Sequence, residues 1–138
     1  MATVKMSIPL PVSVDMAWQM IGGFNTLKDW HPAIEKSELE DGGRVRRLSL
    51  AGGGSIVERL ETFSENEHAY TYTIEQGPLP VANYKSTIRV YQEPGKPGCI
   101  VEWSSDFAAA GAPENEAVKV IQGIYQAGFD NLKTLFGG

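Results

Sequence analysis

The chain has 138 residues, of which 42% are hydrophobic and 21% are charged, and its formal net charge at pH 7 is −5. No apolar run approaches the roughly 20 residues that span a bilayer, and the acidic balance argues against a nucleic-acid partner. This length suits one domain that buries enough surface to hold a core and a cavity. We therefore expect a single domain over residues 1–138 with no membrane span.

The sequence contains one cysteine, Cys99, and two histidines. A single cysteine rules out an intrachain disulfide, and three such side chains are too few for the usual zinc spacings. We therefore expect neither a structural metal nor a cofactor. The N-terminus has no basic segment followed by a long apolar stretch, so the cytoplasm is the expected location.

The N-terminal elements are expected to be short. Residues 3–8 alternate as a strand does, and prolines follow them. Ser13 can cap a helix over residues 14–21, which a pair of glycines ends. A second helix over residues 27–30 ends just before Pro32, because proline disfavours helix in the residue that precedes it.

A meander of strands is expected in the middle of the chain, where apolar residues recur with period two between turns rich in Gly, Pro, Asn and Asp. Together with the first strand they make a seven-stranded antiparallel sheet. A sheet of that size curls under its own twist, and its concave face must be covered. The expected strands lie near residues 33–40, 44–51, 55–63, 68–76, 84–92 and 99–107.

A long amphipathic C-terminal helix is expected to provide the cover. Pro113 suits its first turn, and apolar residues recur at helical spacing as far as Leu135. Gly123 and Gly128 each cost about 1 kcal/mol relative to alanine in a helix, so either the sheet approaches closely there or space is left for a ligand. The predicted fold is α+β, with a curved sheet wrapped around this helix and two short helices after the first strand.

An apolar loop points to a cavity. The segment Gly77-Pro78-Leu79-Pro80-Val81 joins two strands, although loops at the surface are usually built from polar turn formers. Glu58, Tyr84 and Ser86 lie on the flanking strands, where alternation can turn them to one side together with apolar residues. A few polar groups among apolar ones are typical of a ligand pocket, although apolar side chains such as Ile74 and Phe129 could instead fill the space.

The element order and several motifs resemble the START-like superfamily, also called SRPBCC, whose fold is the helix-grip. The resemblance covers nearly the whole chain, and within the superfamily the chain is most similar to the bacterial polyketide cyclase/dehydrase-like branch. It implies a cavity between sheet and helix more firmly than it implies a reaction. The motifs are Trp30-His31-Pro32, Glu58-Arg59-Leu60, Gly77-Pro78-Leu79-Pro80-Val81 before Asn83-Tyr84, and Val101-Glu102-Trp103-Ser104.

Part of the chain is also similar to the plant abscisic-acid receptors, and this similarity implies which residues line the cavity. The gate and latch sequences of those receptors are replaced here by Ala51-Gly52-Gly53-Gly54 and Leu79-Pro80-Val81, so a hormone-gated phosphatase inhibitor is not implied. The implied polar residues are Lys36, Glu58, Tyr84, Ser86 and Glu102, and the implied apolar wall comprises Tyr72, Ile74, Leu79, Val81, Val120, Ile124 and Gly128.

Glu58 has two expected states, which depend on its neighbours. Without a partner, burial would raise the pKa of its carboxyl group, whereas an ammonium beside it would favour the ionised form. We predict that Lys36 is this partner and that the pair is the polar anchor of the cavity. The pattern also allows Glu58 or Lys36 to face solvent on the convex side of the sheet.

Two further segments leave alternatives open. In strand 99–107, composition would bury Trp103, whereas the resemblance turns Glu102 inward, and a bulge could reconcile parts of each. The arginines of segment 44–47 could bind a phosphate, but we favour a solvated sheet face paired with Glu58 or Glu61. His31 is expected to cap or pack, outside the cavity wall.

The leading functional hypothesis is the binding of a hydrophobic or amphipathic small molecule, such as a lipid-, hormone- or polyketide-like ligand. The second is a polyketide cyclase/dehydratase-type enzyme in which Glu58 or Tyr84 transfers a proton. In the third, ligand binding changes the loops at the mouth of the cavity, residues 52–54 and 77–80, and a protein partner binds that surface. We expect a monomer or a weak dimer.

Overall fold

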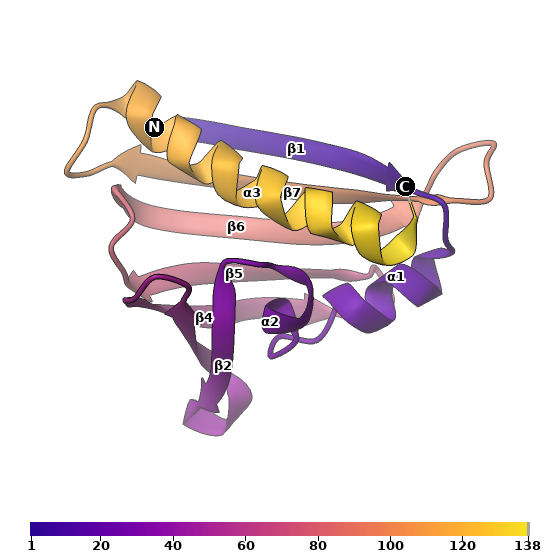
Figure 1. Ribbon diagram of the computed structural model, residues 1–138, viewed down its shortest axis with the longest axis horizontal. Helices are drawn as coiled ribbons and strands as arrows, with labels where there is room; N and C mark the ends of the chain where they lie inside the picture. Colours follow the sequence, from indigo (N-terminus) through magenta and orange to yellow (C-terminus); the bar gives the residue numbers. More distant parts are fainter. Residues whose placement is uncertain (138) are drawn as a thin grey trace.

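Seven strands form one antiparallel sheet in the order β1-β7-β6-β5-β4-β3-β2 (Figure 1). The computed structural model describes residues 1–137. From β2 to β7, each strand pairs with the next along the chain, and β1 joins this meander by pairing with β7. The strands are β1 (Ala2–Leu10), β2 (Ile34–Glu40), β3 (Val45–Leu50), β4 (Ser55–Ser64), β5 (Ala69–Gln76), β6 (Val81–Gln92) and β7 (Cys99–Ala109).

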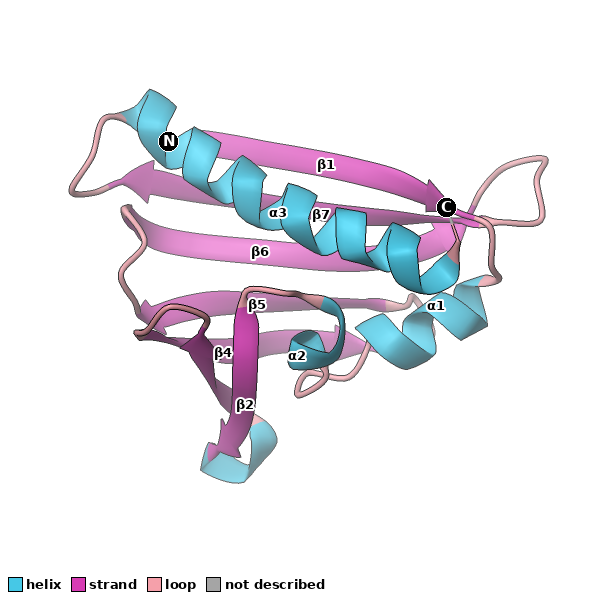
Figure 2. Ribbon diagram, in the orientation of Figure 1, coloured by secondary structure: helices cyan, strands magenta, loops and turns pink. Residues whose placement is uncertain are grey.

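The helices lie on one side of this sheet (Figure 2). They are α1 (Val14–Ile21), α2 (Leu27–Trp30) and α3 (Glu114–Phe136), and a short 3₁₀ turn, η1 (Asp41–Gly43), joins β2 to β3. The Ser13 hydroxyl accepts a hydrogen bond from the Met16 amide at 3.2 Å, as expected of a helix N-cap. Within residues 1–137, no helix combines the length and the apolar character needed to cross a membrane.

The predicted element order is confirmed, and the largest boundary difference is at β6. This strand begins at Val81, whereas the sequence pattern predicted a start near residue 84. A register shift against β7 falls between Ala82 and Lys85, and Asn83 there has a positive φ of 54°. Asparagine tolerates this left-handed conformation, so the strand continues through a bulge that the sequence pattern does not show.

The sheet bends sharply between its two ends. In Figure 1, β2 runs nearly perpendicular to β1, β7 and β6, which follow the direction of α3. Pairing between β4 and β5 shifts register twice, between Val57 and Glu58 and between Leu60 and Thr62. Such bulges bend the strand that carries them and increase its twist. The bend provides the concave face on which α3 lies.

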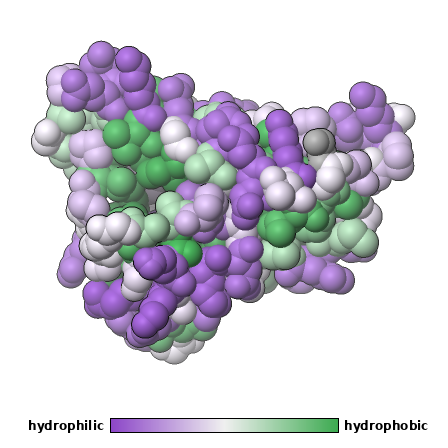
Figure 3. All heavy atoms as spheres, in the orientation of Figure 1, coloured by the Kyte–Doolittle hydropathy of each residue, from purple (hydrophilic) through white to green (hydrophobic). Residues whose placement is uncertain are grey.

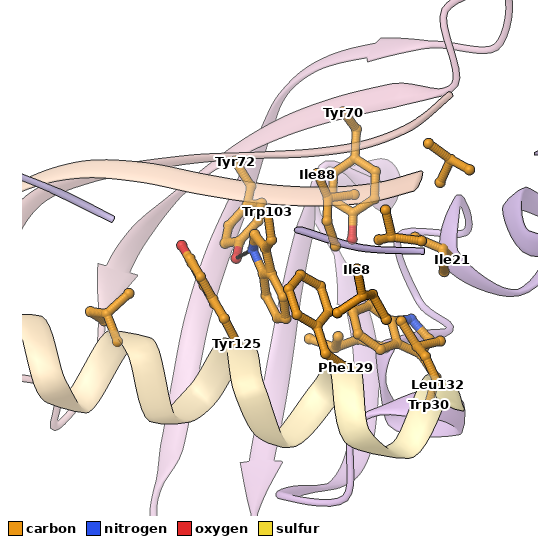
Figure 4. Packing of buried hydrophobic residues seen from close by; sticks show 14 of the residues in the cluster. Ile8, Ile21, Trp30, Tyr70, Tyr72, Ile88, Trp103, Tyr125, Phe129 and Leu132 are labelled. Carbon is orange, nitrogen blue, oxygen red and sulfur yellow. Dashed lines mark hydrogen bonds between the residues drawn. The ribbon is translucent and has the colours of Figure 1, made fainter. Parts of the chain in front are cut away.

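Aromatic side chains fill the space between α3 and the sheet (Figure 4). Tyr125 and Phe129 of α3 point toward Trp103 of β7, and all three are almost completely buried. The rings of Trp103 and Tyr125 stack with centroids 4.2 Å apart and an interplanar angle of 18°. Trp30 of α2 meets Trp103 edge-on at 5.4 Å. These contacts join α2, α3 and β7 in one core.

Close packing explains Gly128 but not Gly123. A Cβ atom added at Gly128 would lie 3.0 Å from carbon atoms of Trp30 and His31 and 3.1 Å from one of Trp103. Gly123 is exposed, and a Cβ atom there would meet nothing within 4 Å. Of the two explanations offered by the sequence, close approach therefore applies to Gly128, and nothing in the structure explains Gly123.

We predict opposite effects of alanine at these two positions. Gly128→Ala should destabilise the protein, because overpacking a well-packed core costs roughly 1–3 kcal/mol. Gly123→Ala should stabilise it by up to about 1 kcal/mol, because alanine is the better helix former and meets no obstacle. Urea unfolding of both variants measures the difference. Equal stabilities would contradict the close packing described at Gly128.

Candidate functional site

A cavity of about 200 Å³ lies between the concave face of the sheet, α2 and α3. Figure 3 shows hydrophobic side chains in a hollow between the N-terminal part of α3 and the strands below it, on the side where the β3–β4 and β5–β6 loops lie. The apolar lining residues are Leu27, Ala33, Ile34, Leu48, Leu50, Ala51, Ile56, Ile74, Leu79, Trp103 and Ile124, and the polar ones are His31, Glu58, Tyr72 and Tyr84.

Glu58 on the cavity wall forms an ion pair with Arg46 inside the protein. The two residues face each other across β3 and β4. Arg46 Nε donates to Glu58 Oε1 at 2.8 Å, and Nη2 lies 2.7 Å from the same oxygen. The Arg46 side chain is 0% exposed and that of Glu58 is 7% exposed. Burial of both charges requires that each stays paired with the other.

The Arg46 guanidinium is held from its other sides as well. Nη1 donates to the main-chain carbonyl of Phe24 at 2.8 Å. The guanidinium carbon lies 4.2 Å from the ring centroid of Phe24 and 4.9 Å from that of Tyr72, which are cation–π distances. Arg46 therefore connects β3, β4, β5 and the loop after α1 at one end of the cavity.

The predicted pair of Lys36 with Glu58 is wrong. Lys36 is exposed on β2, and Arg46 takes the place proposed for it. Pairing of β2 with β3 shifts between Ile34 and Lys36, so the inward positions become Ile34 and Ser37. For segment 44–47, the predicted pairing with Glu58 is confirmed at Arg46, but the predicted solvent exposure is wrong there. Arg47 is exposed and pairs with Glu40 at 2.8 Å.

A chain of hydroxyl groups runs from the cavity into the layer between β6 and α3. Tyr84 Oη lies 2.5 Å from Tyr125 Oη, which lies 3.0 Å from Ser86 Oγ. Ser86 Oγ donates to the main-chain carbonyl of Ser104 at 2.9 Å. A carbonyl only accepts, and each hydroxyl has one proton. Ser86 therefore accepts from Tyr125, and Tyr125 accepts from Tyr84.

Tyr72 stands at the cavity end of this chain. Trp103 Nε1 shares its hydrogen bond between Tyr72 Oη and Ser86 Oγ, at 3.0 Å from each (Figure 4). The distance from Tyr72 Oη to Tyr84 Oη is 3.5 Å, which is longer than the 2.5–3.0 Å usual between hydroxyl groups. Because the Tyr84 proton is already donated to Tyr125, only Tyr72 can donate across this gap. Within residues 1–137, its hydroxyl proton therefore has only this long contact.

Burial shifts the pKa values of the groups around the cavity. It raises the pKa of Tyr72 and Tyr84 well above the usual value and that of Tyr125 to about 12, so these phenols keep their protons at neutral pH. Burial also raises the pKa of Glu58, and the Arg46 charge opposes this shift. Arginine does not lose its proton in proteins, so we describe Glu58 and Arg46 as an ionised pair.

His31 also belongs to the cavity wall. Its Nδ1 accepts a hydrogen bond from the Ala33 amide at 3.2 Å, and its Nε2 lies 2.7 Å from the Ile124 carbonyl oxygen. Burial lowers the pKa of His31, so the ring is neutral with its proton on Nε2. The expectation that His31 packs or caps agrees with these contacts, whereas its predicted place outside the cavity wall is wrong.

Several other predicted site residues lie in or beside the cavity. Val81 lines an adjoining pocket of about 280 Å³ at the β5–β6 loop, which shares part of its wall with the cavity. Ser86 is buried behind the wall in the hydroxyl chain, and Gly128 is packed against aromatic rings rather than open to the cavity. The predicted residues on the cavity wall are Glu58, Tyr72, Ile74, Leu79, Tyr84 and Ile124.

The predicted inward orientation of Glu102 is wrong. Its side chain is 21% exposed and lies 3.9 Å from Lys5 Nζ of β1. Register between β6 and β7 is continuous here, so alternation turns Trp103 inward and Glu102 outward. Val120 is likewise outside the wall, with 38% exposure, because it lies beside the buried stripe of α3 that includes Ile121.

The family of the chain follows from comparison with known proteins. The model of the family described as "Polyketide cyclase / dehydrase and lipid transport" matches residues 1–137, and the chain belongs to this family. Its fold is that of the START-like proteins. A START superfamily protein from Mycobacterium smegmatis is 13% identical, with a TM-score of 0.79 over 98% of this chain and 97% of that one.

Two solved bacterial structures are more similar in sequence. The protein XoxI from Bacillus cereus is 43% identical, with a TM-score of 0.95 over 99% of this chain and 96% of that chain. An uncharacterized protein from Bacillus thuringiensis is 42% identical, with a TM-score of 0.95 over 99% of this chain and 100% of that chain. Neither description names a ligand or a reaction.

We predict that Arg46→Met destabilises the protein in a pH-dependent way. Removal of one partner leaves the Glu58 charge buried alone, which costs roughly 3–5 kcal/mol at neutral pH. Without Arg46, burial raises the pKa of Glu58 further, so the folded variant favours the protonated form. Its deficit relative to the natural protein should therefore shrink as the pH falls toward about 4.3, the usual pKa of glutamate. Urea unfolding across this range measures it.

Two variants serve as controls for this prediction. The double variant Arg46→Met/Glu58→Leu should recover much of the loss, because it replaces both charges with apolar groups. Arg47→Met, on the exposed side of the same strand, should change stability little. A loss that does not vary with pH, or a double variant no more stable than the single one, would contradict the buried pair.

We predict that His31 stays neutral in mildly acidic buffer. The unfolded chain takes up a proton near the usual pKa of about 6.5, whereas the buried ring does not, so the stability that His31 contributes is lost as the pH falls through this range. Nitrogen-15 NMR should show a protonated Nε2 and an unprotonated Nδ1. His68, which is partly exposed, supplies the comparison. An imidazolium signal from His31 in the folded protein would contradict this assignment.

Proposed function

We propose that the protein binds a small hydrophobic or amphipathic molecule in the cavity between the sheet and α3. The observation that carries this proposal is a mostly apolar cavity of about 200 Å³ with Glu58 and Tyr72 on its wall. Small-molecule sites generally combine apolar walls with a few polar groups that fix orientation. The family description, which includes lipid transport, supports the same function.

The size of the cavity favours a compact ligand. Its volume is below the roughly 300–1,000 Å³ of common small-molecule sites. The adjoining pocket of about 280 Å³ shares Ile74, Leu79 and Tyr84 with the cavity, so the two spaces meet at these side chains. We propose that a ring or a short chain fits the cavity as it stands and that a longer ligand extends past Leu79.

We predict that filling the cavity abolishes binding. Ile74→Trp places a larger side chain on the wall and should remove binding of Prodan, a neutral fluorescent naphthalene probe. Thr73→Trp changes the adjacent residue of β5, which does not line the cavity, and should leave binding intact. Native mass spectrometry of the protein from its own host should show a retained molecule that Ile74→Trp lacks. Equal Prodan binding by both variants would place the probe elsewhere.

A cyclase/dehydratase-type enzyme is the second candidate function, and one observation favours Glu58 as its base. Both Arg46 contacts go to Oε1, and Oε2 accepts no hydrogen bond from any residue among 1–137. A carboxylate with a free oxygen in an apolar cavity can accept a proton from a carbonyl substrate. Tyr84 suits the role less well, because its proton is donated to Tyr125. Turnover that survives Glu58→Gln would remove Glu58 from this role.

Other expectations stay predictions from the sequence. They include a protein partner at the mouth of the cavity, a monomeric or weakly dimeric state, and a cytoplasmic location. Size measurement with and without Prodan would test the oligomeric state. Hydrogen exchange at residues 52–54 and 77–80, compared between the same two samples, would test whether ligand binding changes the mouth that a partner would contact.

A further inference from the structure

We infer that the cavity selects neutral ligands that carry a hydroxyl group and rejects carboxylates of the same shape. This inference rests on the proposed binding function and names the class of ligand. It follows from which polar atoms the cavity wall leaves without a partner. One of these atoms is a carboxylate oxygen of Glu58, and the other is the hydroxyl proton of Tyr72.

The charged group that a ligand meets on the cavity wall is the Glu58 carboxylate, and Arg46, which balances its charge, does not line the cavity. Arg46 is 0% exposed, and its guanidinium is enclosed by Glu58 Oε1, the Phe24 carbonyl and the neighbouring aromatic rings. Among the described residues that line the cavity, none is lysine or arginine, and both ring nitrogens of His31 already have partners. A carboxylate ligand would therefore bring a second negative charge to a site whose cation, Arg46, already balances Glu58, which is unfavourable in a site of low dielectric.

The donor on the wall is the Tyr72 hydroxyl. In the hydroxyl chain, Tyr84 donates to Tyr125, Tyr125 to Ser86 and Ser86 to the Ser104 carbonyl, so none of these protons is available to a ligand. Tyr72 accepts from Trp103 Nε1, which also contacts Ser86 Oγ, and the hydrogen bond open to its own proton among the described residues is the 3.5 Å contact with Tyr84. Tyr72 can therefore offer a hydrogen bond to a ligand at little cost in protein contacts.

We expect a single ligand hydroxyl to contact both wall groups. Glu58 and Tyr72 come from the paired strands β4 and β5, and the Arg46 guanidinium contacts both, at 2.8 Å from Glu58 Oε1 and 4.9 Å from the Tyr72 ring centroid. A hydroxyl group donates one hydrogen bond and accepts others. It can donate to Glu58 Oε2 and accept from Tyr72, while the apolar part of the ligand contacts the apolar wall.

Three probes of one chain length test this inference: heptanol, its methyl ether and heptanoate. Competition with Prodan at neutral pH, followed by NMR of the Trp103 indole, reports their affinities. Hydrogen bonds to charged groups contribute more binding free energy than those between neutral groups. Heptanol, which can donate to Glu58, should therefore bind roughly tenfold tighter than the ether. Heptanoate should bind more weakly than the ether, because heptanoate carries a negative charge and the ether does not. Both lack the hydroxyl donor of heptanol.

Variants assign the effect to the two groups. Tyr72→Phe should weaken heptanol binding severalfold, whereas Tyr91→Phe, on β6 outside the cavity wall, should not. Glu58→Gln removes the negative charge while an amide oxygen can still accept from Arg46, so the discrimination against heptanoate should be lost. If Glu58→Gln does not fold, two measurements decide: the affinities of the natural protein for the three probes, and the affinity of Tyr72→Phe for heptanol.

The outcomes separate this inference from the proposed function. Heptanoate that binds as tightly as heptanol, or an ether that equals heptanol, would overturn the hydroxyl preference while the cavity stays a binding site. Prodan binding that none of the three probes displaces would overturn it too. Absence of both Prodan and probe binding, together with a clean mass from the natural host, would count against the proposed function itself.

Discussion

The buried ion pair of Arg46 and Glu58 is the constraint on which the site depends. A guanidinium that is 0% exposed must have its charge compensated nearby, because an unpaired charge inside a protein costs several kcal/mol. Strands β3 and β4 supply the two partners in register, and the loop after α1 supplies the Phe24 carbonyl. The pair therefore determines which end of the cavity is polar and places a carboxylate, rather than a cation, on its wall.

The packing of α3 determines where space is left. At Gly128 the helix backbone lies so close to Trp30, His31 and Trp103 that a methyl group would crowd them. One turn earlier, Ile124 faces the cavity, and its carbonyl oxygen holds His31. Along α3, the cavity-facing residue Ile124 is thus followed one turn later by the tightly packed Gly128. The hydrogen bond between His31 and Ile124 connects the end of α2 to this part of the helix.

The sequence predicted the elements well because the signals for them are local. Capping at Ser13, period-two alternation and glycine-rich turns each act over a few residues, and the element order agrees with the structure. The site was predicted less well. Lys36 faces solvent because a register shift in β2 moves the inward position to Ser37. Glu102 faces outward because β7 keeps its alternation, as the buried Trp103 had indicated. A signal for Arg46 existed, since it shares strand parity with Leu48 and Leu50.

By itself the sequence determined the class of fold, the family and the presence of acidic and hydroxyl side chains in the strands around a cavity. Only the tertiary structure decided that Arg46 is the buried arginine that pairs with Glu58, that His31 belongs to the wall and that the donor path from Tyr84 runs through Tyr125 and Ser86 to the Ser104 carbonyl. These relations join residues that are far apart in the chain, and they depend on bulges and on the close approach of α3. Such features arise from packing between elements, and no periodic pattern in a single segment encodes them.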